Sequence, residues 1–443
     1  MRTNVPAEPT ARGPESLLRD ELEALTTKRL RATISRLLDA KGPLQKRLAA
    51  AGVTSPSDVS CLDDLEAVEP TTKADLRANY PFGLLCVPRH EVVRVHASSG
   101  TGGKPTVVAF TRHDLEAWTD LMARSMAAAG LRAGMVLHNA NGYGLFTGGL
   151  GFHQGAERVG ATVVPVSGGF TARQVMLLCD LRAEVLVSTP SYALAIADAL
   201  AASRLGPQDL SLELGFFGGE PWTEHMRAEI EVRLGLRAVN FYGLSELCGP
   251  GVASECLAAR DGLHVNEDHF IAEVIDPLDG HRLGPGEEGE LVFTTLQREA
   301  MPLLRYRTGD IGTLVTEPCE CGSAMVRLTG LRGRQDDMVI VRGVNLHPSQ
   351  VEHVLSLCQG ASAHYRLVID RSGPLDEVTL ECEAADAGAD TEHLGAHLSE
   401  LLRSHLGLRV TVSLGPPGSV PRSEGKAVRV LDRRPARRER PRR

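Results

Sequence analysis

A short segment near residue 100 combines the residue types that bind phosphate. Residues 98 to 106 read SSGTGGKPT, so three glycines and a lysine stand among hydroxyl side chains, between two strand-like runs. Backbone N–H groups with hydroxyls and an ammonium form an anion cradle, suited to the β- and γ-phosphates of ATP. It is not a Walker loop, because the lysine precedes Pro-Thr and a strand, not a helix. The predicted phosphate loop consists of Ser98, Ser99, Gly100, Thr101, Gly102, Gly103 and Lys104, and a flexible hairpin turn is the alternative.

A second set of residues has the types that bind zinc. Cys256, His264, Cys319 and Cys321 would supply three sulfur ligands and one nitrogen ligand. Four protein ligands leave no open position on the ion, so the site would be structural. The spacing is irregular, because seven residues separate the first two positions and one residue separates the last two. Reduced thiols are the alternative, since the nine cysteines are scattered and odd in number, unlike a disulfide framework.

The elements that must position these residues alternate in type. Leucines at helical spacing predict one or two amphipathic helices over residues 15 to 50. From Val92 onward, runs rich in β-branched and aromatic residues alternate with helical patterns, which indicates a largely parallel sheet covered on both faces. One helix is predicted from Thr111 to Gly130, where Thr111 and Asp114 fit a capping box.

The second half of the chain follows a different pattern. The runs FIAEVID, GELVFTTL and MVIVRG have no long helices between them, so they predict a smaller antiparallel or barrel-like unit. After about residue 336 the chain has strands of its own and a helix near 391 to 406, enough for a small α+β domain. The predicted fold class is α/β, with a large N-terminal domain over 1–335, a small C-terminal domain over 336–432 and a basic, disordered tail over 433–443.

Length and composition limit the class of protein. The chain has 443 residues, enough for two domains, and its formal net charge of −8 argues against nucleic acid as the main partner. The first residues lack the apolar core of a secretory signal, and no stretch approaches the roughly 18 apolar residues that cross a bilayer. We therefore expect a cytoplasmic protein without a membrane partner.

Seven motifs follow one another in the order found in the adenylate-forming superfamily. They are SSGTGGKPT, YGLFTGGLG (143–151), FFGGEPW (216–222), YGLSE (242–246), RYRTGD (305–310), GRQDDMVIVRGVNLHPSQ (333–350) and PRSEGKAVRV (421–430). From about residue 90 to 430 the chain resembles the phenylacetate–CoA ligases of that superfamily, and it departs from them at Gly102, where a second threonine is common. The resemblance implies a large adenylate-forming domain and a small, mobile C-terminal domain.

The resemblance also implies which residues bind ATP. Glu246 resembles the carboxylate that coordinates Mg²⁺, a cation that takes oxygen ligands. Asp310 resembles the residue that accepts hydrogen bonds from both ribose hydroxyls. Tyr242 would stack on the adenine base. The remaining residues implied in nucleotide binding are Gly219, Glu220 and Pro221 along the adenine, Gly243 and Ser245 in the motif of Glu246, and Arg334 near the domain junction.

Two further residues are implied in catalysis. Lys426 in PRSEGK resembles the catalytic lysine, whose ammonium stabilises negative charge as the acyl-adenylate forms. Asp336 resembles the hinge at which the C-terminal domain swings between an adenylate-forming and a thioester-forming arrangement, and its neighbour Asp337 could share that role. An Asp-Asp surface turn is the alternative to the hinge.

Positions where the acid would bind differ from those of the phenylacetate ligases. Those enzymes usually have a tyrosine at the position of Asn141, whereas Phe146 is retained. Gly219 stands where alanine is usual, and Cys248 where methionine is usual. An amide and two smaller side chains predict a pocket for a hydroxy- or amino-substituted aryl acid. The alternative is that Asn141 bonds to the backbone of its own glycine-rich loop.

The resulting hypothesis is an ATP-dependent ligase that converts an aromatic carboxylic acid to its acyl-adenylate and then to a thioester of coenzyme A. Mg²⁺ would accompany ATP. Some relatives carry a Pro-Cys-x-Cys-Gly knuckle similar to residues 318 to 322, which favours a structural Zn²⁺. The alternative function is an adenylating enzyme of secondary metabolism that loads the phosphopantetheine thiol of a carrier protein. The resemblance is compatible with a homodimer.

Overall fold

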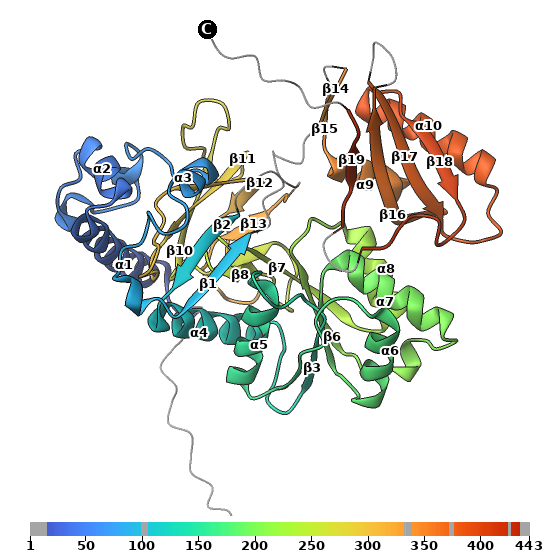
Figure 1. Cartoon of the computed structure of the whole chain (residues 1–443), viewed down its shortest axis with the longest axis horizontal. Helices are drawn as coiled ribbons and strands as arrows, with labels where there is room; N and C mark the ends of the chain where they lie inside the picture. Colours follow the sequence, from blue (N-terminus) through green and yellow to red (C-terminus); the bar gives the residue numbers. More distant parts are fainter. Residues whose placement is uncertain are drawn as a thin grey trace, which may run out of the picture. The chain divides into compact units, whose positions relative to one another are not determined.

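The computed structural model describes residues 16–98, 105–331, 333, 339–342, 344–371, 376–423 and 427–434. The helices and strands fall into two compact units, and Figure 1 labels most of these elements. The first unit comprises Met1–Ser167 and Val239–Leu331, and the second comprises Gly168–Ala238 and Arg332–Arg443.

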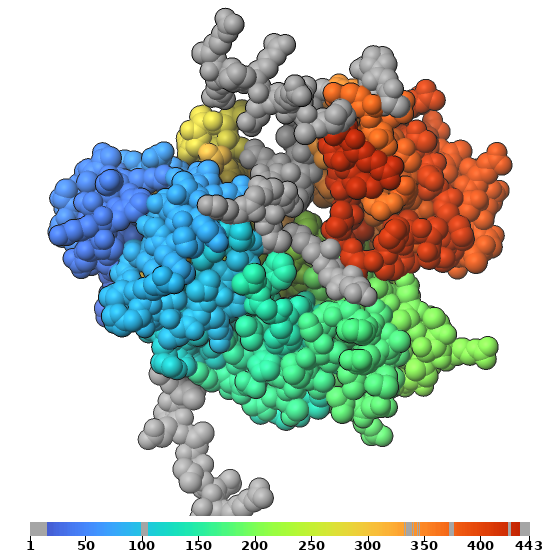
Figure 2. All heavy atoms as spheres, viewed as in Figure 1, coloured from blue at the N-terminus to red at the C-terminus, as the bar shows by residue number. Residues whose placement is uncertain are grey.

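The first unit begins with two amphipathic helices. Helix α1 (Arg19–Ala40) buries Leu30 and Ile34, which are four residues apart and therefore on one face. Helix α2 (Pro43–Ala50) follows after a two-residue turn. These helices confirm the prediction for residues 15 to 50, and their side chains form part of the continuous blue surface in Figure 2.

Helix α4 (Arg112–Ala128) begins at the capping box predicted from the sequence. The Thr111 N–H donates to Oδ2 of Asp114 at 2.9 Å, and the Asp114 N–H donates to the Thr111 hydroxyl at 3.1 Å. Trp118 and Met122 are buried on the apolar face. The predicted helix and its start are therefore confirmed.

Helix α5 (Gly148–Val159) packs closely against α4. A Cβ atom at Gly155 would lie 2.6 Å from the Cβ of Met122 and 2.6 Å from the Cε of Met126. Such distances are far shorter than carbon atoms tolerate, so only glycine permits this approach.

The strands of the first unit form parallel and antiparallel pairs. Strands β3 and β4 pair in parallel, whereas β1 and β2 form an antiparallel hairpin. The others form an antiparallel ladder in the order β10–β11–β12–β13–β9–β8–β7, in agreement with the antiparallel unit predicted from FIAEVID and GELVFTTL. The bounds are α3 (Lys73–Ala78), β1 (Arg94–Ser98), β2 (Thr106–Phe110), β3 (Val136–Asn139), β4 (Thr162–Val164), β7 (Arg237–Leu244), β8 (Gly249–Ser254), β9 (Leu263–Val265), β10 (Phe270–Ile275), β11 (Glu288–Thr295), β12 (Tyr306–Val315) and β13 (Arg327–Thr329).

The second unit contains two parallel strands and three helices from the middle of the chain. Strands β5 and β6 pair in parallel, and all of β5 is buried. This arrangement confirms the α/β pattern predicted for the region. The bounds are α6 (Thr171–Asp180), β5 (Val185–Ser188), α7 (Pro190–Ala202), β6 (Leu214–Gly218) and α8 (Glu224–Leu234).

The C-terminal part of the second unit is a four-stranded sheet in the order β18–β17–β16–β19, with two helices. Helix α10 coincides with the helix predicted near 391 to 406, and its Leu398 and Leu402 lie in the core with Leu367 and Leu380 of the sheet. The bounds are β14 (Val339–Val341), β15 (Val344–Leu346), α9 (Pro348–Leu357), β16 (Ala361–Asp370), β17 (Glu377–Ala384), α10 (Thr391–Leu406), β18 (Thr411–Gly415) and β19 (Val430–Asp432).

The run MVIVRG departs from the prediction. We expected it to pair with the antiparallel strands before it, but its strand β14 pairs with β15 instead. The chain reverses direction at Arg342, whose φ is 52°. Strand β15, the next strand in the sequence, therefore pairs with β14 as a local hairpin.

Two other expectations concern membrane-spanning helices and the domain boundary. No helix within the described residues is long and apolar enough to cross a membrane. The boundary predicted at residue 336 lies outside the described residues, as do residues 435–443 of the predicted tail. The division into domains 1–335 and 336–432 therefore stays a prediction.

Candidate active site

The segment Tyr242 to Glu246 lies where β7 ends and the chain turns into β8. A Cβ atom at Gly243 would lie 1.8 Å from the carbonyl oxygen of Gly249, so any other residue would force the two strands apart. The register of the pair also shifts between Tyr242 and Gly243, as at a β-bulge. The glycine of YGLSE is thus required by a backbone contact, which fixes the residues on either side of it.

Two predicted nucleotide-binding residues meet across the antiparallel ladder. The Tyr242 hydroxyl on β7 donates to Oδ2 of Asp310 on β12 at 2.6 Å. Asp310 is only 9% exposed, and its N–H donates to the Thr308 hydroxyl at 3.0 Å. A short bond from a hydroxyl to a carboxylate is among the stronger kinds. It holds the Asp310 side chain in one orientation.

Glu246 and Ser245 follow in the turn after β7. Glu246 is 4% exposed, and its carboxylate has no hydrogen bond or ion pair among the residues that the structure describes. The Ser245 hydroxyl lies 3.1 Å from that of Thr147, just before α5. A carboxylate buried without a protein partner is costly unless a cation or a donor approaches it. This property is the one expected of a metal ligand.

The predicted adenine segment follows β6 in the second unit. Gly219 has φ +82°, in the left-handed region that glycine favours. Glu220 accepts the Ser191 N–H at Oε1 and the Ala427 N–H at Oε2, each at 2.7 Å. Pro221 is exposed. Because both Glu220 oxygens hold the protein's own backbone, the side chain has a structural task that the motif alone did not reveal.

Two residues predicted to bind the acid lie around the start of α5. Phe146 is 50% exposed, and Asn141 is half-buried. The Asn141 N–H donates to Oδ1 of Asn139 at 3.2 Å, but its side-chain amide makes no hydrogen bond within the described part of the chain. The amide is therefore not satisfied by the described backbone of its own loop.

Cys248, the third predicted acid-binding residue of this unit, is buried. Its Sγ lies 3.7 Å from the carbonyl oxygens of Gly249 and Pro250, and burial raises the pKa of the thiol to about 12. It behaves as an enclosed, neutral side chain.

A hydrogen-bond chain beside Asn141 was not predicted. Nδ2 of Asn139 donates to the Tyr143 hydroxyl at 2.9 Å, which lies 3.1 Å from Nδ1 of His153. His153 in turn lies 3.1 Å from Glu157, four residues further along α5. Burial raises the pKa of Tyr143 to about 12, so its hydroxyl stays protonated near neutral pH. The helical spacing of His153 and Glu157 was the available sequence signal.

The four predicted zinc ligands converge in the first unit. Cys256 follows β8, His264 lies on β9, and Cys319 and Cys321 lie between β12 and β13, with all four ligand atoms within 4.8 Å of one another. The Cys256 and Cys319 sulfurs are 3.8 Å apart, and the Cys321 sulfur is 3.5 Å from Nε2 of His264.

These separations match a tetrahedral zinc centre. Zinc bonds of about 2.3 Å to sulfur and about 2.0 Å to nitrogen place two sulfurs about 3.8 Å apart and sulfur about 3.5 Å from nitrogen. A disulfide would need the sulfurs about 2.05 Å apart, and all nine cysteines are free. The chemistry and spacing of the donors therefore fit the metal that was predicted.

Several predicted site residues lie outside the described residues. They are Ser99, Gly100, Thr101, Gly102, Gly103, Lys104, Arg334, Asp336, Asp337 and Lys426. Of the phosphate loop, only Ser98 is described; it ends β1, and its buried Oγ has no hydrogen-bond partner among the described residues. The roles of all these residues stay predictions.

Comparison with known families gives two matches in the order expected from the motifs. Residues 23–297 match the model of the AMP-binding enzyme family, and residues 343–434 match that of the AMP-binding enzyme C-terminal domain. The chain is also 48% identical to phenylacetate–coenzyme A ligase of Thermus thermophilus, over 95% of this chain and 98% of the relative.

Comparison with solved structures also gives a CoA ligase. A crystal structure of 2-hydroxyisobutyryl-CoA ligase in the postadenylation state, in complex with 2-HIB-AMP, has a TM-score of 0.88 at 30% identity and covers 97% of this chain and 94% of its own. The same enzyme in the thioesterification state, with 2-HIB-AMP and CoA, has a TM-score of 0.71 at 31% identity, covering 95% and 91%. The likeness is greater to the postadenylation state.

The contact at Gly243 leads to a stability prediction. Gly243→Ala should destabilise the protein by ~1–3 kcal/mol, because its methyl group cannot be accommodated without separating β7 and β8. Thermal unfolding of the purified variant measures the loss. Gly42→Ala is the matched control, since Gly42 has an ordinary φ of −87° and no atom within 4 Å of its Cβ position. Equal unfolding temperatures for the two variants would contradict the steric role of Gly243.

Proposed function

The chain belongs to the AMP-binding enzyme family, in which it is an acid–thiol ligase of the phenylacetate–CoA ligase type, and from this membership we propose the chemistry of its site. The enzyme activates an aromatic carboxylic acid with ATP and transfers the acyl group to coenzyme A. The observation that carries the proposal is the Tyr242–Asp310 hydrogen bond, together with the buried carboxylate of Glu246, four residues after Tyr242, which has no partner among the described residues.

In the first half-reaction the substrate carboxylate attacks the α-phosphorus of ATP. The bond from that phosphorus to the bridging oxygen breaks, pyrophosphate leaves, and the acyl-adenylate remains. The repulsion between a carboxylate and a triphosphate must be reduced, and both must be held in line. Asp310, oriented by Tyr242, accepts hydrogen bonds from the ribose. Glu246 would hold Mg²⁺, which neutralises phosphate charge, and residues 98 to 104 would cradle the β- and γ-phosphates.

In the second half-reaction a thiol attacks the acyl carbon and AMP leaves. The relatives at 45–48% identity are named as coenzyme A ligases, which supports coenzyme A as the acceptor over a carrier-protein thiol. In our proposal Asp336 is the hinge that lets residues 336–432 move between the two steps. The match of residues 343–434 to a C-terminal domain family supports this division.

Lys426 is proposed to stabilise the charge that develops during adenylate formation. Lys426→Ala should therefore lower pyrophosphate release by ~100–1,000-fold, yet leave thioester formation from supplied acyl-adenylate within a few-fold of wild type. Exposed Lys28 on α1 offers the control Lys28→Ala, which should change neither step. Equal losses in both steps would contradict the role of Lys426.

The same assay tests the whole function. Wild-type enzyme is given ATP with a panel of phenylacetates, benzoates and their hydroxy and amino derivatives, and then either coenzyme A or a phosphopantetheinylated carrier protein. We expect pyrophosphate release with at least one aromatic acid, and a thioester of coenzyme A. An enzyme that releases no pyrophosphate with any of these acids would not have the proposed function.

We propose further that the preferred acid carries a polar ring substituent. The half-buried side-chain amide of Asn141 supports this, because it has no hydrogen bond among the described residues and a polar group left unpaired under a bound substrate costs about 1–3 kcal/mol. Phe146, half exposed, would stack on the ring. The names of the relatives make unsubstituted phenylacetate the competing substrate.

Replacing Asn141 separates the two substrates. Asn141→Tyr should reduce kcat/KM for a hydroxy- or amino-substituted aryl acid by ~10-fold or more, because the hydrogen bond to the substituent is lost. Unsubstituted phenylacetate is the internal control and should be affected much less. A uniform loss, or a wild-type preference for phenylacetate, would argue against the polar substituent.

We also propose a structural zinc ion bound by Cys256, His264, Cys319 and Cys321. The tetrahedral separations of these donors support it. The ion would join the chain after β8 to the segment between β12 and β13, and thus stabilise the ladder that carries Asp310.

Metal analysis tests the zinc proposal. Purified enzyme should hold about one zinc ion per chain after dialysis, and a Cys319→Ser, Cys321→Ser variant should lose both the ion and thermal stability. A Cys61→Ser, Cys179→Ser variant is the matched control, because neither cysteine belongs to the cluster. Freshly purified protein without zinc would end the proposal.

A further inference from the structure

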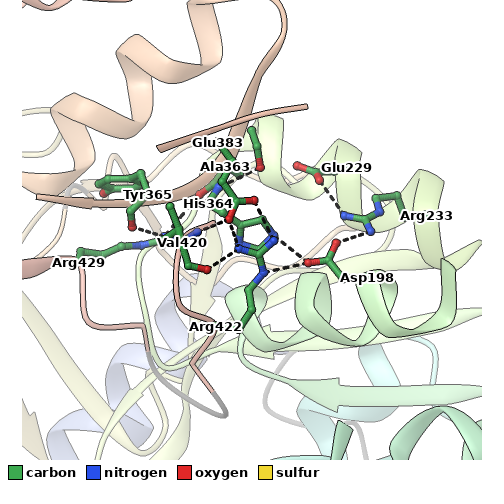
Figure 3. A network of polar contacts seen from close by, with 11 residues as sticks. Asp198, Glu229, Arg233, Ala363, His364, Tyr365, Glu383, Val420, Arg422 and Arg429 are labelled. Carbon is green, nitrogen blue, oxygen red and sulfur yellow. Dashed lines mark hydrogen bonds and ion pairs between the residues drawn. The ribbon is translucent and has the colours of Figure 1, made fainter. Parts of the chain in front are cut away.

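Within the second unit, one arginine joins the C-terminal sheet to a helix from the middle of the chain. The guanidinium of Arg422 donates to both oxygens of Glu383, at 2.6 and 2.9 Å, and its Nε donates to Oδ2 of Asp198 on α7 at 2.9 Å. Figure 3 shows this guanidinium between the two carboxylates. Two parallel bonds to one carboxylate fix the plane of an arginine, so the side chain has little freedom.

Both carboxylates are held by other groups as well. Oδ1 of Asp198 accepts from Arg233 of α8 at 2.6 Å, and Nε2 of His364 lies 3.5 Å from Oδ2. Burial opposes ionisation of Asp198, but the hydrogen bonds and charges of its partners prevail and lower its pKa. Glu383 is 1% exposed and also accepts the Val420 N–H at 2.6 Å. The network therefore fixes residues 420 to 422 against both α7 and the C-terminal sheet.

A second contact fixes the chain a few residues later. Glu220, in the loop after β6, accepts the N–H of Ser191 at the start of α7 and the N–H of Ala427, each at 2.7 Å. One carboxylate thus ties two backbone segments that are far apart in sequence.

Arg422 and Ala427 stand on either side of Lys426 in the sequence. Lys426 itself lies outside the described residues, but a peptide bond joins it to Ala427, and only three residues separate it from Arg422. The contacts at Arg422 and Ala427 therefore hold the described residues on both sides of the lysine in the sequence. Asp198 and Glu220 come from α7 and the loop after β6, whereas Glu383, the other acid that binds Arg422, lies on β17 of the C-terminal sheet.

We infer that Asp198 and Glu220 are positioning residues for adenylate formation: they hold Arg422 and Ala427, which flank Lys426 in the sequence, and they serve the first half-reaction only. The inference rests on the proposed function. If the C-terminal domain moves for the second step, these contacts must break, because their acids lie outside that domain.

An ordinary surface ion pair would have no such effect, since exposed pairs contribute little. The present contacts differ in two ways. Arg422 makes two bonds to Glu383, which is almost fully buried. The arginine side chain is therefore already ordered before it binds Asp198. Glu220 binds backbone N–H groups, which have no side-chain freedom to lose on binding.

The test compares Asp198→Asn and Glu220→Gln with wild type in the two half-reactions. Each variant should slow pyrophosphate exchange at saturating ATP and acid by about tenfold, the effect of losing one charge-assisted hydrogen bond. Thioester formation from supplied acyl-adenylate should stay within about twofold. Glu229→Gln is the control, because Glu229 bonds to Arg233 in the same network but touches neither Arg422 nor Ala427. It should leave both steps unchanged.

Two further measurements separate positioning from other roles. In a Lys426→Ala background, Asp198→Asn should cause no additional loss, because Asp198 acts through that lysine. Asp198→Glu, which keeps the charge, should recover part of the rate. The KM for ATP should not rise in Glu220→Gln, whereas a residue that contacted adenine would raise it.

Each outcome decides between the alternatives. Equal loss in both half-reactions, additive loss in the Lys426→Ala background, or wild-type exchange rates in both variants would overturn the inference. If one variant does not fold, as thermal unfolding reports, the other decides. A wild-type enzyme without pyrophosphate exchange on any aryl acid would instead be a failure of the proposed function.

Discussion

At Gly243 the backbone of β7 passes so close to the carbonyl oxygen of Gly249 that no side chain fits between them. β7 ends one residue later, at Leu244, so the contact fixes the backbone between Tyr242 and Glu246. The Tyr242 hydroxyl carries the constraint across the ladder to Asp310 on β12. The candidate site is thus built on paired strands, which suits a reaction whose two substrates must be held in line.

Carboxylates serve opposite purposes in the two units. Glu246 is buried with no partner among the described residues, so its charge is available to a cation. Glu220 has both oxygens occupied by backbone N–H groups, so its charge holds the protein together. Asp198 combines features of both. It has cationic partners, as a structural carboxylate does, but its side chain is 33% exposed, so water can replace a partner that leaves. Such a contact can select one arrangement and still be broken in every catalytic cycle.

Local signals in the sequence predicted much of the fold. The capping box at Thr111 and the leucines of α10 depend on residues three or four positions apart, and both helices begin where expected. The pairing of MVIVRG was predicted wrongly, because an alternating strand pattern does not indicate which strand will be its neighbour. The link between Asp198 and Arg422 spans 224 residues and carries no local signal, so it could not be predicted. The four possible zinc ligands were identified by residue type, but their irregular spacing in the sequence did not predict that their ligand atoms lie within 4.8 Å of one another.

The tight contact between α4 and α5 restricts how this enzyme can evolve. Helix α5 begins directly after the loop that carries Asn141 and Phe146, and Gly155 within it leaves no room for even a methyl group beside Met122. Such close packing resists any shift of the helix that a remodelled loop would require. Descendants with a new acid preference should therefore arise by exchange of single side chains in the loop, with its length retained.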